Sequence, residues 1–164
     1  MKIVFDASTL ILLAKVDILR EALDVAAGII PATVRKEVLA KSSADAELVR
    51  LLIRKEKIEV QRTSGKASEK LMADFNLHKG EAEALALAAT LKLAVAVDDG
   101  PAIKACKVLG IPFVTAIHFL VSLAAKNTIE KSVALEKIIR LAKLGRYKAQ
   151  IIEHATQLIK GGCQ

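Results

Sequence analysis

Hydrophobic positions along the chain fall into two kinds of segment that alternate. Short apolar runs of strand length cover residues 3–5, 28–30, 93–97 and 112–114, and residues 57–61 also read as an extended segment. Longer segments with apolar residues at helical spacing cover residues 9–15, 31–40, 42–55, 67–75, 80–92, 101–110, 117–126, 129–144 and 148–159. Strands that alternate with helices are typical of a parallel sheet, because parallel neighbours need a crossover connection. The pattern therefore predicts an α/β fold with a central parallel sheet.

The last two predicted helices, residues 129–144 and 148–159, are amphipathic and are separated by a break at Gly145. The chain shows no internal repeat, low-complexity segment or linker, so we expect residues 1–164 to form one domain. The two helices would cover that domain or pack on a partner, because their apolar faces need a surface to bury. These faces consist of Val133, Ile138 and Leu141 on the first helix and Ile151, Ile152, Ala155 and Ile159 on the second.

Composition then narrows the class of protein. The chain has 164 residues, 53% of them hydrophobic, which is enough to bury a real core. No apolar run approaches a membrane span, and Asp6 interrupts any secretory charge pattern at the start, so we expect a cytoplasmic protein without membrane association. The two cysteines, Cys106 and Cys163, are too few for a disulfide framework and lack metal-ligand spacing. We interpret them as a buried small hydrophobe and a tail residue.

Positive charge is concentrated toward the end of the chain. From Lys126 onward there are eight Lys and Arg residues against three Glu, and this excess supplies most of the net charge of +7. A basic excess suits a polyanion partner such as nucleic acid, although a solvated helical face would look the same. Aromatic residues make up only 3% of the chain, so base stacking is poorly supported. Any contact with nucleic acid would mainly involve its backbone.

Acidic residues stand at or near the predicted strand ends. In open α/β sheets the functional crevice lies outside the carboxyl ends of the strands, so acids from distant segments could meet there. Carboxylates that lie a few ångströms apart raise one another's pKa, and a hard divalent cation such as Mg²⁺ or Mn²⁺ relieves their repulsion. The acids concerned are Asp6, Glu37, Glu81, Glu83, Asp98 and Asp99.

Structural explanations also exist for the strand-end acids. Asp98 and Asp99 could be turn and N-cap residues of the helix that begins at Pro101, which explains one of them better than both. Asp6 is harder to explain in this way. Because it directly follows an apolar run, its charge must be paired, bound to a ligand or at the sheet edge.

The helical acids have alternatives as well. With Gly80 as N-cap, Glu83 would reach back to cap the helix, and Glu81 would face the site, because residues two apart do not share a helix face. Glu37 could instead pair with Lys41 one turn later on a solvent-exposed face.

Four segments that contain these acids resemble the PIN-domain nucleases, in that family's order. They are VFDAST (4–9), IPATVRKEVL (30–39), GEAEALALA (80–88) and VAVDDGPA (95–102). The Gly-Glu-Ala-Glu-Ala helix start, the paired Asp-Asp and the tail over residues 141–162 are similar to a prokaryotic, toxin-like (VapC-related) subgroup. The resemblance thus covers nearly the whole chain.

The resemblance implies a three-layer α/β/α fold and a Mg²⁺- or Mn²⁺-dependent endoribonuclease, often the toxin of a toxin–antitoxin pair. RNA, an antitoxin protein and a second copy of the chain are the implied partners. The implied catalytic acids are Asp6, Glu37, Glu81 and Asp99. The implied metal ligands are Asp6, Glu81, Asp98 and Asp99, supported by Ser8 and Glu83.

The chain departs from that subgroup after the last strand. Residues 115–118, Thr-Ala-Ile-His, stand where the subgroup usually has Gly-Thr-Leu-Gly, so a glycine and a hydroxyl beside the site are missing. Two other functions compete with the nuclease. An aspartyl-phosphate phosphotransferase would need a second Asp at the position that Ser8 occupies. A PIN-like scaffold that binds RNA or protein without cleaving it is the main alternative.

Overall fold

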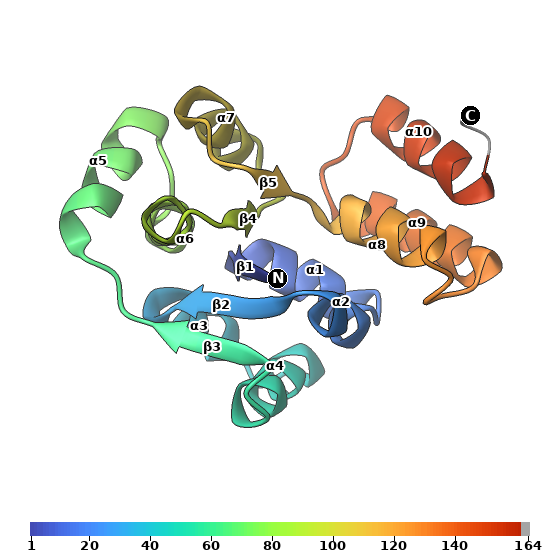
Figure 1. The fold of residues 1–164 in the computed structure, drawn as a ribbon, viewed down its shortest axis with the longest axis horizontal. Helices are drawn as coiled ribbons and strands as arrows, with labels where there is room; N and C mark the ends of the chain where they lie inside the picture. Colours follow the sequence, from blue (N-terminus) through green and yellow to red (C-terminus); the bar gives the residue numbers. More distant parts are fainter. Residues whose placement is uncertain (162–164) are drawn as a thin grey trace.

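A five-stranded parallel sheet runs through the centre of the protein, which is described by a computed structural model covering residues 1–161 (Figure 1). The strands are β1 (Lys2–Phe5), β2 (Ala27–Pro31), β3 (Ile58–Gln61), β4 (Ala94–Ala96) and β5 (Phe113–Val114). They lie in the order β3-β2-β1-β4-β5, and each neighbouring pair is parallel. The α/β fold with a central parallel sheet is therefore confirmed.

Helices connect the strands and follow the last of them. They are α1 (Ala7–Lys15), α2 (Leu19–Val25), α3 (Ala32–Leu39), α4 (Ala44–Arg54), α5 (Gly65–Phe75), α6 (Lys79–Leu91), α7 (Gly100–Leu109), α8 (Ala116–Ala125), α9 (Lys131–Leu144) and α10 (Ala149–Lys160). The sequence pattern missed α2, which is one of the shortest helices. It also placed Pro31 at the first position of a helix, whereas Pro31 ends β2 and is the N-cap of α3.

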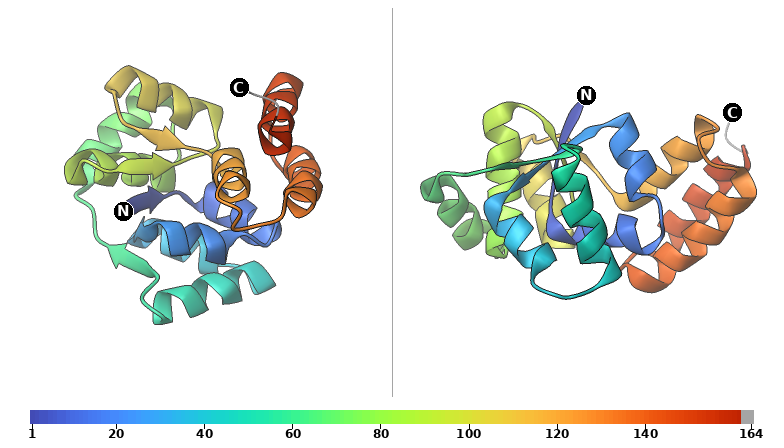
Figure 2. Two further views of the ribbon diagram at one scale, coloured as in Figure 1. Left: turned by 45° about the vertical axis from the view of Figure 1, so that its right-hand side comes forward. Right: turned by 90° about the horizontal axis from the view of Figure 1, so that it is seen from below.

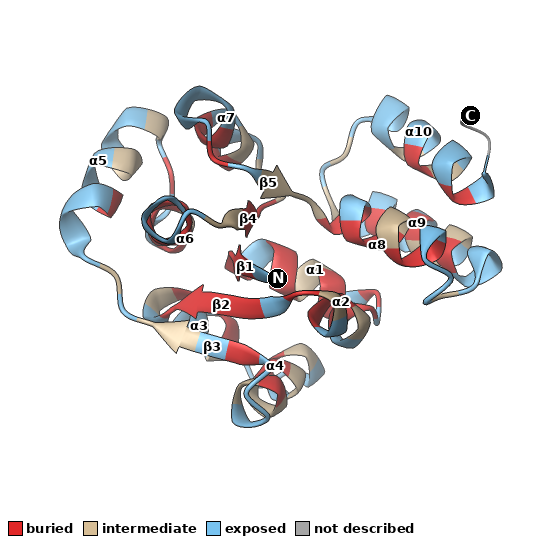
Figure 3. Ribbon diagram, in the orientation of Figure 1, coloured by how far each residue is buried: buried red, intermediate tan, exposed pale blue. Residues whose placement is uncertain are grey.

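Each face of the sheet carries its own hydrophobic core. On β1 the side chains alternate, so Ile3 and Phe5 join one core and Val4 joins the other. The first core includes apolar residues of α1, α2, α3, α4, α8, α9 and α10, and the second includes residues of α6 and α7. Figure 3 shows that burial continues along the central strands. Burial on both faces explains why the central strands β1, β2 and β4 are almost entirely apolar, and it gives the three-layer architecture. The edge strand β3 is less buried and carries Glu59 and Gln61.

Helices α9 and α10 pack beside each other and against α8 at one end of the molecule, as the views of Figure 2 show. Leu141 is fully buried, and Ala155 is 2% exposed. Val133 and Ile151, which the sequence pattern assigned to the packing faces, are instead 36% and 46% exposed. The buried faces of the two helices are therefore narrower than the sequence pattern indicated.

Two other sequence features can be located in the fold. Cys106 is buried in α7, as expected for a small hydrophobe, whereas Cys163 lies outside the described residues. Across residues 1–161, no helix combines the length and the apolar character that a membrane crossing requires.

Candidate active site

The sheet order reverses between β1 and β4, and this point organises the site. On one side of β1 lie β2 and then β3. On its other side lie β4 and then β5. The backbone N–H of Asp6 donates to the carbonyl of Ala96 at 3.1 Å, which extends the pairing of β1 and β4 by one residue. Asp6 and Asp98 therefore meet at the carboxyl edge where strand order reverses, which is the usual ligand crevice of an open α/β sheet.

Asp6 is buried with only half of its carboxylate satisfied. It is the N-cap of α1, and its Oδ1 accepts a hydrogen bond of 2.8 Å from the Thr9 N–H. Its Oδ2 is buried and has no hydrogen-bond partner. Burial raises the pKa of Asp6 to about 7; hydrogen bonds from Thr9 oppose this shift, and the charges of Asp98 and Glu81 add to it.

Asp98 is held by donors from three parts of the chain. The Thr9 hydroxyl donates to its Oδ2 at 2.8 Å, and the N–H of Ala116, the first residue of α8, donates to the same oxygen at 3.0 Å. The Tyr147 hydroxyl donates to its Oδ1. Burial raises the pKa of Asp98, and the hydrogen bonds from Tyr147, Thr9 and Ala116 oppose the shift. Asp98 thus ties α1, α8 and the α9–α10 connection together.

Asp99 is engaged very differently. It is the N-cap residue of α7, but its side chain makes no capping hydrogen bond. It is partly exposed and lines the pocket described below. Of the two adjacent aspartates, Asp98 is therefore used by the fold, and Asp99 keeps its carboxylate available for a ligand.

The start of α6 differs from the sequence prediction. His78, not Gly80, is the N-cap, so Glu81 stands at the third helical position and its Oε2 accepts the His78 N–H at 3.0 Å. The capping expected of Glu83 is thus made by Glu81. Burial, followed by the charges of Asp99 and Glu37, raises the pKa of Glu81, while the His78 hydrogen bond opposes the shift. Glu83 is buried, with its carboxylate 4.0 Å from the Lys79 amine.

Glu37 reaches the edge of this cluster from α3. A Cβ atom at Gly80 would lie 2.7 Å from Glu37 Oε2, so the glycine allows the carboxylate to rest directly on the first turn of α6. The alternative ion pair with Lys41 is not among the ion pairs of residues 1–161. Glu37 lies close enough to Glu81 for its charge to raise the pKa of that residue.

A pocket of about 480 Å³ opens over the cluster. Of the predicted site residues, Ser8, Glu81, Asp98 and Asp99 line it, whereas Asp6, Glu37 and Glu83 do not. The described side chains include no group of three or more His, Cys, Asp and Glu that could hold a metal ion as they are arranged.

The chemistry of the donors nevertheless suits a hard divalent cation. Asp6 has an unsatisfied buried oxygen, and the pKa values of Asp6 and Glu81 are raised partly by neighbouring carboxylates. A cation relieves both conditions, and oxygen donors are those that Mg²⁺ and Mn²⁺ select. Asp6, Glu81 and Asp99 are the residues that could hold it.

Sequence reasoning missed several residues at this site. Thr9 had a readable signal, since it carries a hydroxyl three positions after Asp6, a residue type that often caps a helix start. Tyr147 is the one tyrosine in the sequence and follows the break at Gly145, but nothing in the sequence indicates its contact with Asp98. Lys15, His78 and Arg146 also line the pocket.

Comparison with known proteins agrees with this architecture. The profile of the DUF3368 family, whose description is PIN domain, matches residues 2–160. Searches of curated proteins and of solved structures returned no match. The family match spans every strand and helix described above and includes all the acids at the carboxyl edge. The chain belongs to this family of PIN domains.

Proposed function

We propose that the chain is an endoribonuclease that hydrolyses RNA phosphodiester bonds with Mg²⁺ or Mn²⁺ as cofactor. PIN domains are generally nucleases, so family membership supports a nuclease-type function. The observation that carries the metal-dependent form of the proposal is Asp6 Oδ2, a carboxylate oxygen buried without a partner. A buried polar atom left unpaired is costly, and a divalent cation would supply the missing interaction.

The acids would divide the work according to their contacts. Asp6, Glu81 and Asp99 would hold the cation, which when bound activates water and neutralises charge on the attacked phosphate. Asp98 would hold the surrounding elements in place, because its oxygens already accept hydrogen bonds from Thr9, Ala116 and Tyr147. Such chemistry needs no Ser, His or Cys nucleophile.

A non-catalytic scaffold that binds RNA or protein is the second candidate. Two observations favour it, because Glu81 Oε2 already caps α6 and both oxygens of Asp98 already accept hydrogen bonds. In this case the acids would stabilise the helix starts and would take up no cation. The two functions therefore differ in whether Asp6 and Asp99 bind a divalent ion.

The test is cleavage of a mixed pool of single-stranded and structured RNA with Mg²⁺, Mn²⁺ or EDTA. Wild type is compared with Asp6→Asn and Asp99→Asn, and Asp24→Asn is the matched control. Asp24 forms an exposed ion pair with Lys57 at 2.9 Å on the opposite, amino side of the sheet. We expect metal-dependent cleavage by wild type and the control, and strongly reduced cleavage by the two site variants.

Isothermal titration with Mn²⁺ separates the candidates further. If wild type binds Mn²⁺ and Asp6→Asn does not, the nuclease function is supported. RNA binding without ion uptake, together with equal absence of cleavage in all four proteins, would contradict the nuclease and support the scaffold.

We also propose the toxin role, with an antitoxin as partner, on the resemblance of the sequence to the toxin-like subgroup. Expression in a bacterial host should then arrest growth, and Asp6→Asn should remove the arrest. Equal growth with both proteins would contradict the toxin role and leave the biochemical activity to be judged by the cleavage assay.

A further inference from the structure

Two positively charged side chains, Lys15 and Arg146, line the same pocket as Glu81, Asp98 and Asp99. The two cations come from opposite ends of the chain and were absent from the site predicted from the sequence. Both are exposed. Within residues 1–161 neither the Lys15 amine nor the Arg146 guanidinium takes part in a hydrogen bond or an ion pair. Their charges are therefore available to a ligand.

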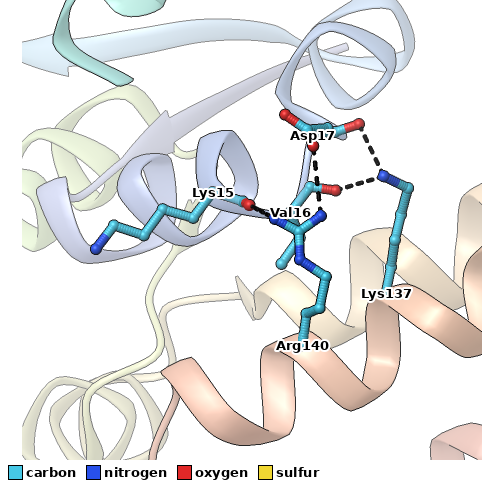
Figure 4. Close-up of polar contacts among 5 residues, drawn as sticks. All are labelled: Lys15, Val16, Asp17, Lys137 and Arg140. Atoms are coloured by element: carbon cyan, nitrogen blue, oxygen red, sulfur yellow. Dashed lines mark hydrogen bonds and ion pairs between the residues drawn. The ribbon is translucent and has the colours of Figure 1, made fainter. Parts of the chain in front are cut away.

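Lys15 is held in place through its backbone. It is the last residue of α1, where helix carbonyls lack intrahelical partners. Arg140 of α9 donates to the Lys15 carbonyl, and Lys137 donates to the Val16 carbonyl at 2.6 Å (Figure 4). Figure 4 shows the Lys15 side chain extending away from these contacts. The base of Lys15 is thus fixed while its amine stays free.

Arg146 is held through its neighbours in the α9–α10 connection. The Tyr147 hydroxyl donates a hydrogen bond to Asp98, and the Tyr147 ring lies so close to Gly145 that a Cβ there would clash with Tyr147 Cε2. The residue before Arg146 and the residue after it are therefore packed together over the acid cluster. Arg146 itself lines the pocket next to them.

We propose that Lys15 and Arg146 form a subsite for the sugar-phosphate backbone of single-stranded RNA, next to the phosphate that is cleaved. This inference rests on the proposed function. An ammonium and a guanidinium that line one pocket suit phosphate oxygens, and Arg can bind them with two parallel hydrogen bonds. Lys15 and Arg146 would bind the neighbouring phosphate, while the acids hold the divalent metal ion at the phosphate that is cleaved.

The rest of the lining indicates how the RNA would be recognised. Ile11, Leu12 and Leu144 supply apolar surface, and no Phe, Tyr or Trp is among the residues that line the pocket. Bases would therefore meet aliphatic side chains and not a stacking platform. Backbone contacts carry no sequence information, so this subsite would not distinguish one RNA sequence from another.

The test measures binding separately from cleavage. Anisotropy of a short fluorescent single-stranded RNA in EDTA, over about 50–200 mM salt, is compared for wild type, Lys15→Gln/Arg146→Gln and the control Arg54→Gln/Lys126→Gln. The control removes the same charges from the end of α4 and from the C-cap of α8. We expect affinity to fall about tenfold for each pocket cation, and the salt slope to fall by about 0.7 for each contact. The control double variant should change the affinity and the salt slope much less.

Three outcomes decide the inference. Equal Kd and equal salt slope in the two double variants would overturn the subsite, even where metal-dependent cleavage is intact. Reduced RNA binding in the pocket variant alone supports the subsite, even where cleavage is absent and the proposed nuclease fails. Equal loss of binding to labelled polyglutamate would overturn the assignment to phosphate. Circular dichroism and rescue by Lys15→Arg/Arg146→Lys exclude misfolding as the cause.

Discussion

The acidic and basic walls of the pocket are built in different ways. The acidic wall combines Asp98 and Asp99, which follow β4, with Glu81 in the first turn of α6. Backbone pairing between β1 and β4 also fixes the buried Asp6 beside it. The basic wall joins Lys15 to the connection after α9, which is held by side-chain contacts. The sheet therefore places the acids, whereas a few polar contacts place the cations.

This difference indicates how the two walls can fail. The acidic wall is disrupted only when its own carboxylates are substituted or when the sheet that positions them is distorted. The basic wall can lose its alignment when the α9–α10 connection shifts, while the sheet stays intact. Changes at the acids should therefore mainly reduce the rate of cleavage, and changes at the connection should weaken RNA binding and local stability.

The largest expected effect distinguishes the two adjacent aspartates. Asp99→Asn should lower RNA cleavage about 10³-fold, roughly 4 kcal/mol of transition-state stabilisation, with little change in stability, because its side chain caps no helix. Asp98→Asn should lower both cleavage and the free energy of unfolding, the latter by about 2 kcal/mol, because the donors from Thr9 and Tyr147 face its oxygens.

Single-turnover kinetics and urea unfolding of the two variants make this comparison. Stability loss in Asp99→Asn together with an unaffected Asp98→Asn would reverse the assignment. In that case Asp98 would be the ligand and Asp99 the support.

The next effect is the pH dependence of the metal-free protein. The pKa of Asp6 is raised from 3.8 to about 7, so between these values the folded state holds a proton that the unfolded state has released. Stability in EDTA should therefore fall as pH rises from about 4 to 7, by roughly 2–3 kcal/mol. Asp6→Asn should flatten this dependence, because an amide stays neutral.

Urea unfolding in EDTA at about pH 5 and pH 8 measures the effect. Added Mg²⁺ should restore stability at the higher pH and have little effect at the lower one. If the wild-type protein became more stable with rising pH in EDTA, Asp6 would not be protonated in the metal-free folded state as proposed.

The sequence predicted the acidic wall because its signals are local. Asp6 follows the apolar residues 3–5, and Asp98 follows residues 93–97, so their meeting at one sheet edge needs only parallel strand order. The start of α6 was misplaced because His78 is an uncommon N-cap, and this shift moved the capping role from Glu83 to Glu81. Local signals thus found the acids and misassigned one of their roles.

The basic wall could not be predicted in the same way. The excess of Lys and Arg after residue 126 pointed to a polyanion partner but did not distinguish Arg146 from the other cations. Tyr147 reaches Asp98 only because α9 docks on the end of α1, which depends on side chains far apart in sequence. Neither hydrophobic periodicity nor motif spacing contains that information.

A smaller effect should follow from crowding at the connection. Gly145 has φ −96° and ψ 169°, which any residue can adopt, so the cost of Gly145→Ala should come from a clash of the new Cβ with the Tyr147 ring, which supplies its nearest atoms. We expect a loss of about 1–2 kcal/mol and weaker RNA binding. In a Tyr147→Ala background the same change should cost nothing further, as a double-mutant cycle in urea would show. Additive losses would mean that the ring does not limit this position.

The smallest effect concerns the docking of α9 on α1. Lys137 donates to the Val16 carbonyl at 2.6 Å, and Arg140 lies 3.4 Å from the Asp17 carboxylate. Because these contacts are largely exposed, Lys137→Met and Arg140→Gln should each cost about 0.5–1 kcal/mol. Lys143→Met on the same helix is the control, since Lys143 takes part in no ion pair among the described residues.

Amide hydrogen exchange shows which part of the protein these substitutions destabilise. In the Lys137 and Arg140 variants, amides of residues 145–147 should exchange sooner, and amides of β1 and β4 should keep their protection. Equal acceleration in the strands would mean that the sheet and the α9–α10 connection open as one unit. The acidic and basic walls would then unfold together, and Lys15 and Arg146 could not move out of the pocket unless the acidic residues also lost their positions.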